Sequence, residues 1–155
     1  MKKIYSLGKI ALLSSLILFL AGNSENESLK PMRIAEESFD SHLEQLANKA
    51  RESRIFKKIR DTQNIDRYNI STQDYNFDLV FKNGELYFWA YQGKVPGSGK
   101  DVFINDFQDK PGIETYLEEE DIKDAQPGKD AATKRSKAEI YKNCLEILRK
   151  INSDI

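Results

Sequence analysis

The sequence predicts an α+β domain, in which a small antiparallel meander of about three strands is flanked by an N-terminal and a C-terminal amphipathic helix. Three observations predict this fold class. Apolar residues recur at helical spacing near both ends of the mature chain, two alternating runs flank Asn83 and Gly84, and a third alternating run starts at Asp101. Three strands with one face covered can be stable where a lone hairpin is not.

The first helix, or two consecutive helices, is predicted between Arg33 and Arg60. The apolar residues that recur there at intervals of three and four are Phe39, Leu43, Leu46, Ala47, Ala50, Ile55 and Ile59. The period is lost from Asp61 to Ser71, where we expect a loop.

A hairpin is predicted from Tyr75 to Gln92, because an Asn-Gly pair favours a two-residue type I′ turn. This turn places Lys82 opposite Glu85, and strict alternation then predicts one core face. Its members are Phe77, Leu79, Phe81, Leu86, Phe88 and Ala90. The same register pairs Phe81 with Leu86, Val80 with Tyr87, Leu79 with Phe88, Asp78 with Trp89, and Phe77 with Ala90.

The opposite face of the hairpin carries Tyr87, Trp89 and Tyr91 at alternate positions of one strand. Large aromatic side chains with a polar edge are concentrated at protein interfaces. These three residues are therefore the predicted partner-binding residues. The alternative is that a helix covers this face, in which case all three are core.

The rest of the domain follows from shorter signals. Gly93 to Lys100 reads as a loop, Asp101 to Phe107 as a third strand, and Gly112 to Asp124 as a short acidic helix that Pro127 and Gly128 terminate. We expect Asp130 to cap a last helix. Its apolar stripe consists of Ala138, Tyr141, Cys144, Leu145, Leu148 and Ile151.

The N-terminus has the pattern of a signal peptide. Lys2, Lys3 and Lys9 precede an uncharged apolar stretch from Ile10 to Leu20, and small residues follow it. This stretch is short for a bilayer, which needs about 20 residues. We expect residues 1–22 to be a signal peptide, 23–32 a polar tether and 33–155 a single globular domain.

Leu20, Ala21 and Gly22 match the three residues that precede the modified cysteine of bacterial lipoproteins. The segment resembles a lipoprotein signal, but Asn23 occupies the cysteine position, so no thioether-linked lipid can form there. Cleavage after Gly22 or Ser24, or retention of the segment as a membrane anchor, are the two remaining outcomes. With its content of Lys, Ile and Asn, the chain also resembles small spirochaete surface proteins, a resemblance that transfers no functional residue.

Charge and cysteine content exclude several classes of protein. The 24 Lys and Arg face 25 Asp and Glu, and three of the basic residues belong to the signal segment, which leaves an acidic mature chain near −4. A nucleic-acid groove needs a concentrated positive field, so nucleic acid is not an expected partner. Cys144 is the only cysteine, so no intramolecular disulfide can form. With one histidine as well, no metal site and no cofactor are predicted.

Four candidate motifs are more simply explained as structure. Gly97 to Lys100 lacks the spacing of a phosphate loop, and His42 has no recognisable nucleophile to serve. Cys144 lies on an apolar stripe, where cysteine acts as a small hydrophobic residue. The acidic run from Glu118 to Asp121 reads as a solvated face. No catalytic residue is predicted.

The function predicted from the sequence is that of a noncatalytic, exported envelope or surface protein, associated with the outer membrane or periplasmic, that binds a host or envelope protein. Its N-terminal segment offers a possible membrane attachment. One alternative is a small secreted or periplasmic hydrolase, for which only Asp74, Asp78 and Glu85 lie near the aromatic strip. Another is a periplasmic structural or immunity-type protein.

Overall fold

The computed structural model describes residues 29–125 and 135–155. The predicted signal peptide, residues 23–28 of the predicted tether, and Asp130, the predicted cap of the last helix, lie outside the described residues. The elements follow one another as α2 (Leu29–Glu52), β1 (Lys57–Thr62), β2 (Ile65–Ser71), β3 (Tyr75–Lys82), β4 (Glu85–Lys94), β5 (Asp101–Phe107), β6 (Thr115–Glu118), α3 (Glu119–Asp124) and α4 (Lys137–Asp154).

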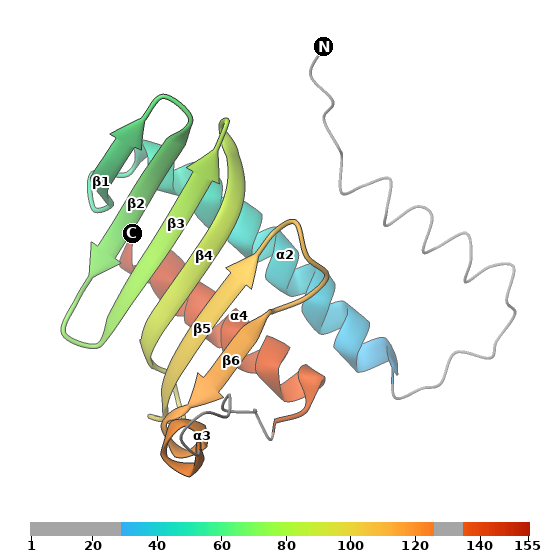
Figure 1. Ribbon diagram of the computed structural model, residues 1–155. Coiled ribbons are helices and arrows are strands. Elements are labelled where there is room, and N and C mark those ends of the chain that lie inside the picture. Colours follow the sequence, from blue (N-terminus) through green and yellow to red (C-terminus); the bar gives the residue numbers. More distant parts are fainter. Residues whose placement is uncertain (1–28, 126–134) are drawn as a thin grey trace, which may run out of the picture.

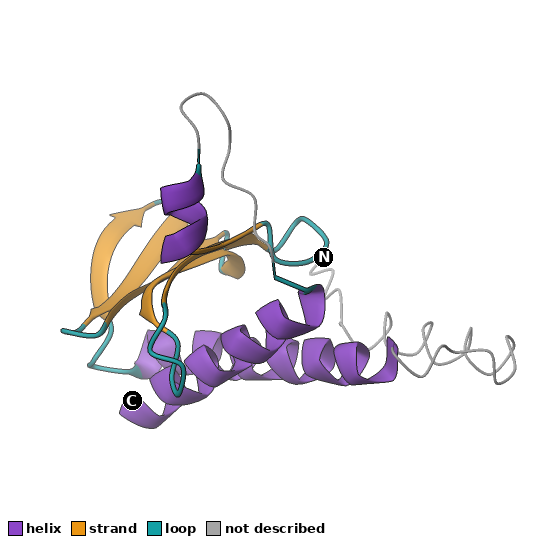
Figure 2. Ribbon diagram, turned by 90° about the horizontal axis from the view of Figure 1, so that it is seen from below, coloured by secondary structure: helices purple, strands orange, loops and turns teal. Residues whose placement is uncertain are grey.

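These elements form two layers (Figure 1). Six antiparallel strands make one sheet, in which their spatial order is their order along the chain. Helices α2 and α4 lie side by side on one face of the sheet, and the short α3 lies on the other side at one end (Figure 2). The α+β class is confirmed, but the expectation of about three strands is wrong, because β1, β2 and β6 were not predicted.

The first helix is shorter at its C-terminal end than predicted. Helix α2 ends at Glu52, and its buried stripe consists of Phe39, Leu43, Leu46, Ala47 and Ala50, as predicted. Ile55 and Ile59 fall outside it and are about half exposed, at 51% and 49%. The helix begins at Leu29, so residues 29–32, expected in the tether, form its first turn, where Pro31 is tolerated.

Strands β1 and β2 replace the predicted helix end and loop. Strand β2 pairs with β3 along its whole length, with Ile70 opposite Phe77 and Tyr68 opposite Leu79. Asp66 takes a position on the same side as these residues and forms an ion pair of 3.0 Å with Lys58 of β1. A charged pair at positions where alternation expects apolar residues obscures the period of two, which is why the sequence pattern did not indicate these strands.

The β3–β4 turn is confirmed, but the register beyond it is not. Asn83 and Gly84 have φ angles of 54° and 81°, as a type I′ turn requires, and Lys82 faces Glu85. A β-bulge follows at Tyr87, so that Val80 faces Phe88, Leu79 faces Trp89, Asp78 faces Ala90 and Phe77 faces Tyr91. The last four predicted pairs are therefore wrong by one residue.

The bulge exchanges the side chains of β4 between the two faces of the sheet. Phe88 and Ala90, predicted to be core, turn away from the helices, while Trp89 and Tyr91 turn towards them and are 0% and 3% exposed. Burying Trp and Tyr in place of Phe and Ala removes more apolar area from water, and aromatic side chains bury about 150–250 Å² each. One extra residue in one strand achieves this exchange.

The third predicted strand is confirmed as β5. The predicted helix from Gly112 to Asp124 is wrong in its first half, where β6 pairs with the free edge of β5 and Tyr116 faces Ile104 in the core. Only Glu119 to Asp124 is helical, as α3. The edge of β5 carries backbone N–H and C=O groups that pair with a strand, whereas a short helix in the same place would leave them without hydrogen bonds.

Helix α4 confirms the last predicted helix. Ser136 accepts a hydrogen bond of 3.2 Å from the amide of Glu139 and so caps its N-terminus. Of the predicted stripe, Ala138 is exposed, while Ile147 adds a buried position. The buried residues of the helix are Tyr141, Cys144, Leu145, Ile147, Leu148 and Ile151.

Candidate functional site

The most distinctive surface of the described residues is the sheet face that α2 and α4 do not cover, which we call the open face (Figures 1 and 2). Its side chains come from alternate positions of β2 to β6. They are Ile65, Arg67, Asn69 and Ser71; Asn76, Asp78, Val80 and Lys82; Phe88, Ala90, Gln92 and Lys94; Asp101, Phe103, Asn105 and Phe107; Thr115 and Leu117. The face thus combines apolar, amide and charged groups.

The three predicted partner-binding residues are divided between the two faces. The Trp89 ring lies in the core between Phe39 and Phe77, with centroid distances of 5.8 and 6.1 Å, and its indole nitrogen donates to Asp106 at 2.7 Å. Tyr91 stacks on Tyr75. Trp89 and Tyr91 are therefore core residues on the face that the helices cover, which is the alternative that the sequence left open. Only Tyr87 remains partly exposed.

An aromatic cluster lies on the open face towards the end where the Asn83–Gly84 turn stands. Because of the bulge, Tyr87 and Phe88 both contact Phe107, with centroid distances of 5.7 and 4.7 Å. The ammonium groups of Lys82 and Lys110 lie 5.2 and 5.3 Å from the Tyr87 and Phe107 ring centroids. The cluster is apolar with a cationic rim. Sequence reasoning named Tyr87 but missed Phe88 and Phe107, since the bulge left no signal in the pattern.

A polar network occupies the middle of the open face. Arg67 binds Asp78 with two hydrogen bonds of 2.9 and 2.7 Å, and the amide of Asn69 donates to Asp78 at 2.9 Å and to the Asn76 side chain at 2.8 Å. The hydrogen bond to Asp78 raises the pKa of Arg67. These hydrogen bonds hold the four side chains in place on the surface.

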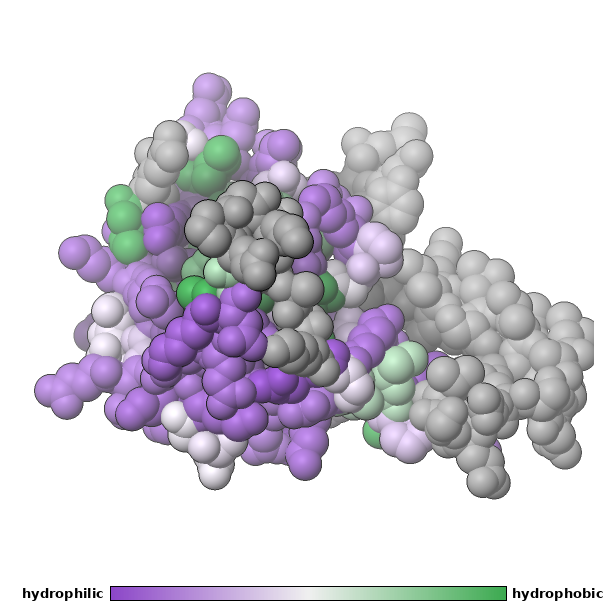
Figure 3. Space-filling view, turned by 60° about the horizontal axis from the view of Figure 1, so that its bottom comes forward, coloured by the Kyte–Doolittle hydropathy of each residue, from purple (hydrophilic) through white to green (hydrophobic). Residues whose placement is uncertain are grey.

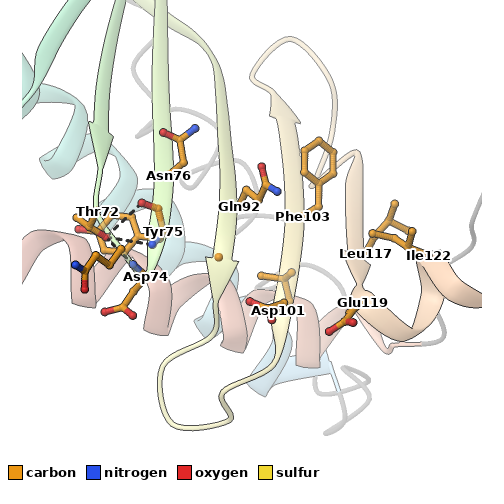
Figure 4. Close-up of a pocket in the computed structure, with 13 residues that line it drawn as sticks. Thr72, Asp74, Tyr75, Asn76, Gln92, Asp101, Phe103, Leu117, Glu119 and Ile122 are labelled. Atoms are coloured by element: carbon orange, nitrogen blue, oxygen red, sulfur yellow. Dashed lines mark hydrogen bonds between the residues drawn. The ribbon is translucent and has the colours of Figure 1, made fainter.

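A groove of about 400 Å³ lies at the other end of the open face, next to α3 (Figure 4). Phe103, Leu117 and Ile122 form its apolar side, and Asn76 and Gln92 its amide side. Phe103 and Ile122 are 36% and 53% exposed. The carboxylates of Asp74, Asp101 and Glu119 line the same groove, and no Lys or Arg does.

Beneath the sheet, acidic groups surround the end of Trp89. Burial raises the pKa of Asp106, and hydrogen bonds from Trp89 and Gln108 oppose that shift. Asp40 of α2 keeps an exposed surface, but partial removal of its carboxylate from water, together with the charges of Glu36, Asp106 and Glu37, raises its pKa to about 6. This cluster belongs to the helix–sheet interface and not to the open face.

Only half of the acidic run from Glu118 to Asp121 is the solvated face that the sequence suggested: Glu119 and Glu120 are exposed, whereas Glu118 and Asp121 are buried. Glu118, 2% exposed, accepts hydrogen bonds from Lys100 at 3.2 Å and from Arg135. Asp121, 3% exposed, accepts from the Glu118 amide at 2.8 Å. Glu118, at the end of β6, thereby links Lys100 of the β4–β5 loop to Arg135, two residues before α4. The spacing of three between Glu118 and Asp121, typical of a capping box, is the signal that could have identified them.

The remaining candidates have structural surroundings. Cys144 is fully buried, and burial raises the pKa of its thiol. His42 is hydrogen-bonded through Nδ1 to the Ser38 carbonyl at 2.7 Å. Gly97 and Lys100 belong to the loop between β4 and β5, as expected.

The carboxylates named for the alternative hydrolase are not brought together. Asp74 precedes β3 at the groove, Asp78 is held by Arg67 in the middle of the face, and Glu85 follows the turn at the far end. Among residues 29–125 and 135–155, no group of three or more His, Cys, Asp or Glu is arranged to hold a metal ion. Nor does any helix within those ranges have the length and hydropathy to cross a membrane.

The chain was compared with family models, with curated proteins and with solved structures, and it matches none of them. The open face, with its aromatic cluster, polar network and groove, is therefore the basis for a functional proposal.

Proposed function

We propose that this chain is a noncatalytic, exported envelope protein that binds a partner protein through the open face of its sheet. The observation that carries the proposal is the asymmetry of the sheet: two long helices cover one face, and the other keeps Phe103 at 36% exposure beside a groove that Ile122 of α3, 53% exposed, also lines. Partly exposed apolar groups within a polar rim are typical of interaction surfaces.

The composition of the open face supports recognition of a folded partner. Seen from the end where α3 lies, the surface is mainly hydrophilic and its hydrophobic residues form small, separate patches (Figure 3). On the open face, a row of side chains that contains Asp78, Ala90 and Asn105 lies between the aromatic cluster and the groove. Two apolar anchor points on either side of a fixed polar centre suit a partner that must dock in one orientation.

The proposed location rests on the N-terminal sequence. The basic residues Lys2, Lys3 and Lys9, followed by the apolar stretch from Ile10 to Leu20, support export. An alkaline phosphatase fusion after about residue 30 should be active outside the cytoplasm, and an inactive, cytoplasmic fusion would contradict export. Because Asn23 offers no thiol, labelled palmitate should not be incorporated at the N-terminus. Protease treatment of whole cells then separates a surface location from a periplasmic one.

Partner binding is tested by site-specific photo-crosslinking in the cells that export the protein. A photoreactive phenylalanine analogue at Phe103 or Phe107 should give a discrete crosslinked species, because both side chains lie on the open face. The matched control is the same analogue at Lys142, which is exposed on α4. Equal crosslinking from Lys142, or none from either open-face position, would contradict the proposal.

A further inference from the structure

We infer that the groove at the α3 end of the open face binds an arginine side chain presented by the partner protein. This inference rests on the proposed function and identifies the chemistry of the partner at one of its two contact points. The charge and hydrogen-bonding capacity of the groove, its apolar side, and two contacts that arginines of this chain already make all favour arginine.

The polar side chains of the groove are rich in acceptors and poor in cations. Carboxylates of Asp74, Asp101 and Glu119 line it with the amides of Asn76 and Gln92. Glu119 is paired with Lys123 at 2.5 Å, whereas no ion pair within the described ranges involves Asp74 or Asp101. A guanidinium group carries one positive charge and five N–H donors, and it needs several acceptors at once.

The apolar side of the groove suits the remainder of an arginine side chain. The Phe103 ring, 36% exposed, and Ile122, 53% exposed, offer a surface on which the methylene groups can lie. A planar cation is also attracted to the face of an aromatic ring. Asp101 and Phe103 lie on the same face of β5, two residues apart, so one ligand can reach both.

Two arginines of this chain make the same kinds of contact elsewhere. On the open face, Arg67 is held by two hydrogen bonds to Asp78, with distances of 2.9 and 2.7 Å. Arg51 places its guanidinium 4.2 Å from the centroid of the Phe81 ring. The groove offers the same two groups, a carboxylate at Asp101 and a phenyl ring at Phe103. No cation of the described residues forms an ion pair with this carboxylate or lies over this ring.

Lys94 is the cation nearest to the groove in the sheet register. It pairs with Asp101 across β4 and β5, and its amide donates to the Asp74 carbonyl at 3.4 Å, yet its side chain does not line the groove. Its charge competes with an incoming arginine. Lys94→Ala should therefore strengthen arginine binding, while loss of an acidic partner should weaken it.

The test is an NMR titration of the purified protein with a blocked tripeptide, acetyl-Leu-Arg-Leu-amide. Backbone amide signals of Gly93, Phe103 and Ile122 should shift and saturate at millimolar concentrations. Replacing the arginine by citrulline, which has the same shape without the charge, should weaken binding about tenfold. Asp101→Asn should weaken it about three- to tenfold, and Glu85→Gln, which removes an equal charge at the other end of the face, should leave it unchanged.

Equal binding of the citrulline peptide, or shifts confined to the aromatic cluster, would overturn the inference. An equal effect of Glu85→Gln would do the same, since it would reduce the result to long-range charge. If Phe107 crosslinks to a partner while the arginine peptide does not bind, the inference fails and the proposed function stands. If neither open-face position crosslinks, the proposed function fails whatever the peptide does.

Discussion

The two faces of the sheet differ in how their side chains are held. On the face covered by α2 and α4, aromatic and aliphatic side chains fill the space, and the indole of Trp89 bonds to the buried Asp106. On the open face, apolar side chains lie among polar ones, such as the hydrogen-bonded Arg67 and Asp78, and stay partly exposed. A single bulge at Tyr87 thus decides which aromatic residues of β4 are buried in the core and which stay partly exposed on the other side of the sheet.

The largest expected effect comes from comparing alanine substitutions at two neighbouring residues of β4 that lie on opposite faces of the sheet. Trp89→Ala should cost about 3 to 5 kcal/mol of the free energy of unfolding, because it empties the centre of the core. Phe88→Ala should cost about 1 kcal/mol, because that ring is already partly exposed. Urea melts of both variants measure the difference. Where Trp89→Ala does not fold, Trp89→Phe gives a smaller loss in the same direction.

Equal losses from the two alanine substitutions would show that the open face is as buried as the covered one. A larger loss of stability from Phe88→Ala than from Trp89→Ala would instead support the register without a bulge, in which Phe88 is core.

The next effect tests how little room the covered face has. A Cβ on Gly93 would lie 2.5 Å from the Asp74 carbonyl oxygen and 2.6 Å from the Tyr75 Cβ. Gly93→Ala should therefore cost about 2 to 4 kcal/mol through steric crowding and the positive φ of 156°. Gly84→Ala is the control, because a Cβ there meets nothing within 4 Å and only the turn geometry is strained, at about 1 kcal/mol. If Gly93→Ala and Gly84→Ala lowered stability equally in thermal melts, the close approach of Gly93 to Asp74 and Tyr75 would have no energetic role.

A third effect concerns the buried carboxylate at the edge of the sheet. Hydrogen bonds from Arg135 and Lys100 lower the pKa of Glu118, so its stabilising contribution is complete above its unfolded pKa near 4.3 and is lost as pH falls through the lower folded value. Glu118→Gln should cost about 1 to 3 kcal/mol at pH 7 and less in acid. Urea melts at several pH values test this, and a loss that does not change with pH would show that the charge is irrelevant.

The smallest effect has the opposite pH dependence and lies on the covered side. The pKa of Asp40 is raised to about 6, so the folded state binds its proton more tightly and stability falls as pH rises from about 4 to about 6. Asp40→Asn should stabilise the protein at pH 7 by under about 1 kcal/mol, because the group keeps an exposed surface. The gain should vanish below pH 4. Glu44→Gln, exposed on the same helix, serves as the control and should show no such dependence.

The comparison between faces also separates what could be predicted from what could not. The buried stripes of α2 and α4 and the strand from Asp101 to Phe107 were predicted, because each follows from spacing within one segment. The predicted partner-binding residues depend on a register with strict alternation along β4, which the bulge at Tyr87 breaks. Of these, only Tyr87 lies beside the open face, and nothing in the sequence drew attention to Phe103, Phe107 or the groove.

By itself, the sequence determined the local features of this protein: the type I′ turn at Asn83 and Gly84, which needs two positive φ angles, and the amphipathic helices, whose period is set by backbone geometry. Tertiary structure decided the rest. Segments β1, β2 and β6 form strands because each has a neighbouring strand that supplies backbone hydrogen bonds. Their own side-chain patterns do not require an extended conformation. The bulge is fixed by burial of Trp89 and Tyr91 against elements distant in sequence, a gain in free energy that no local pattern records.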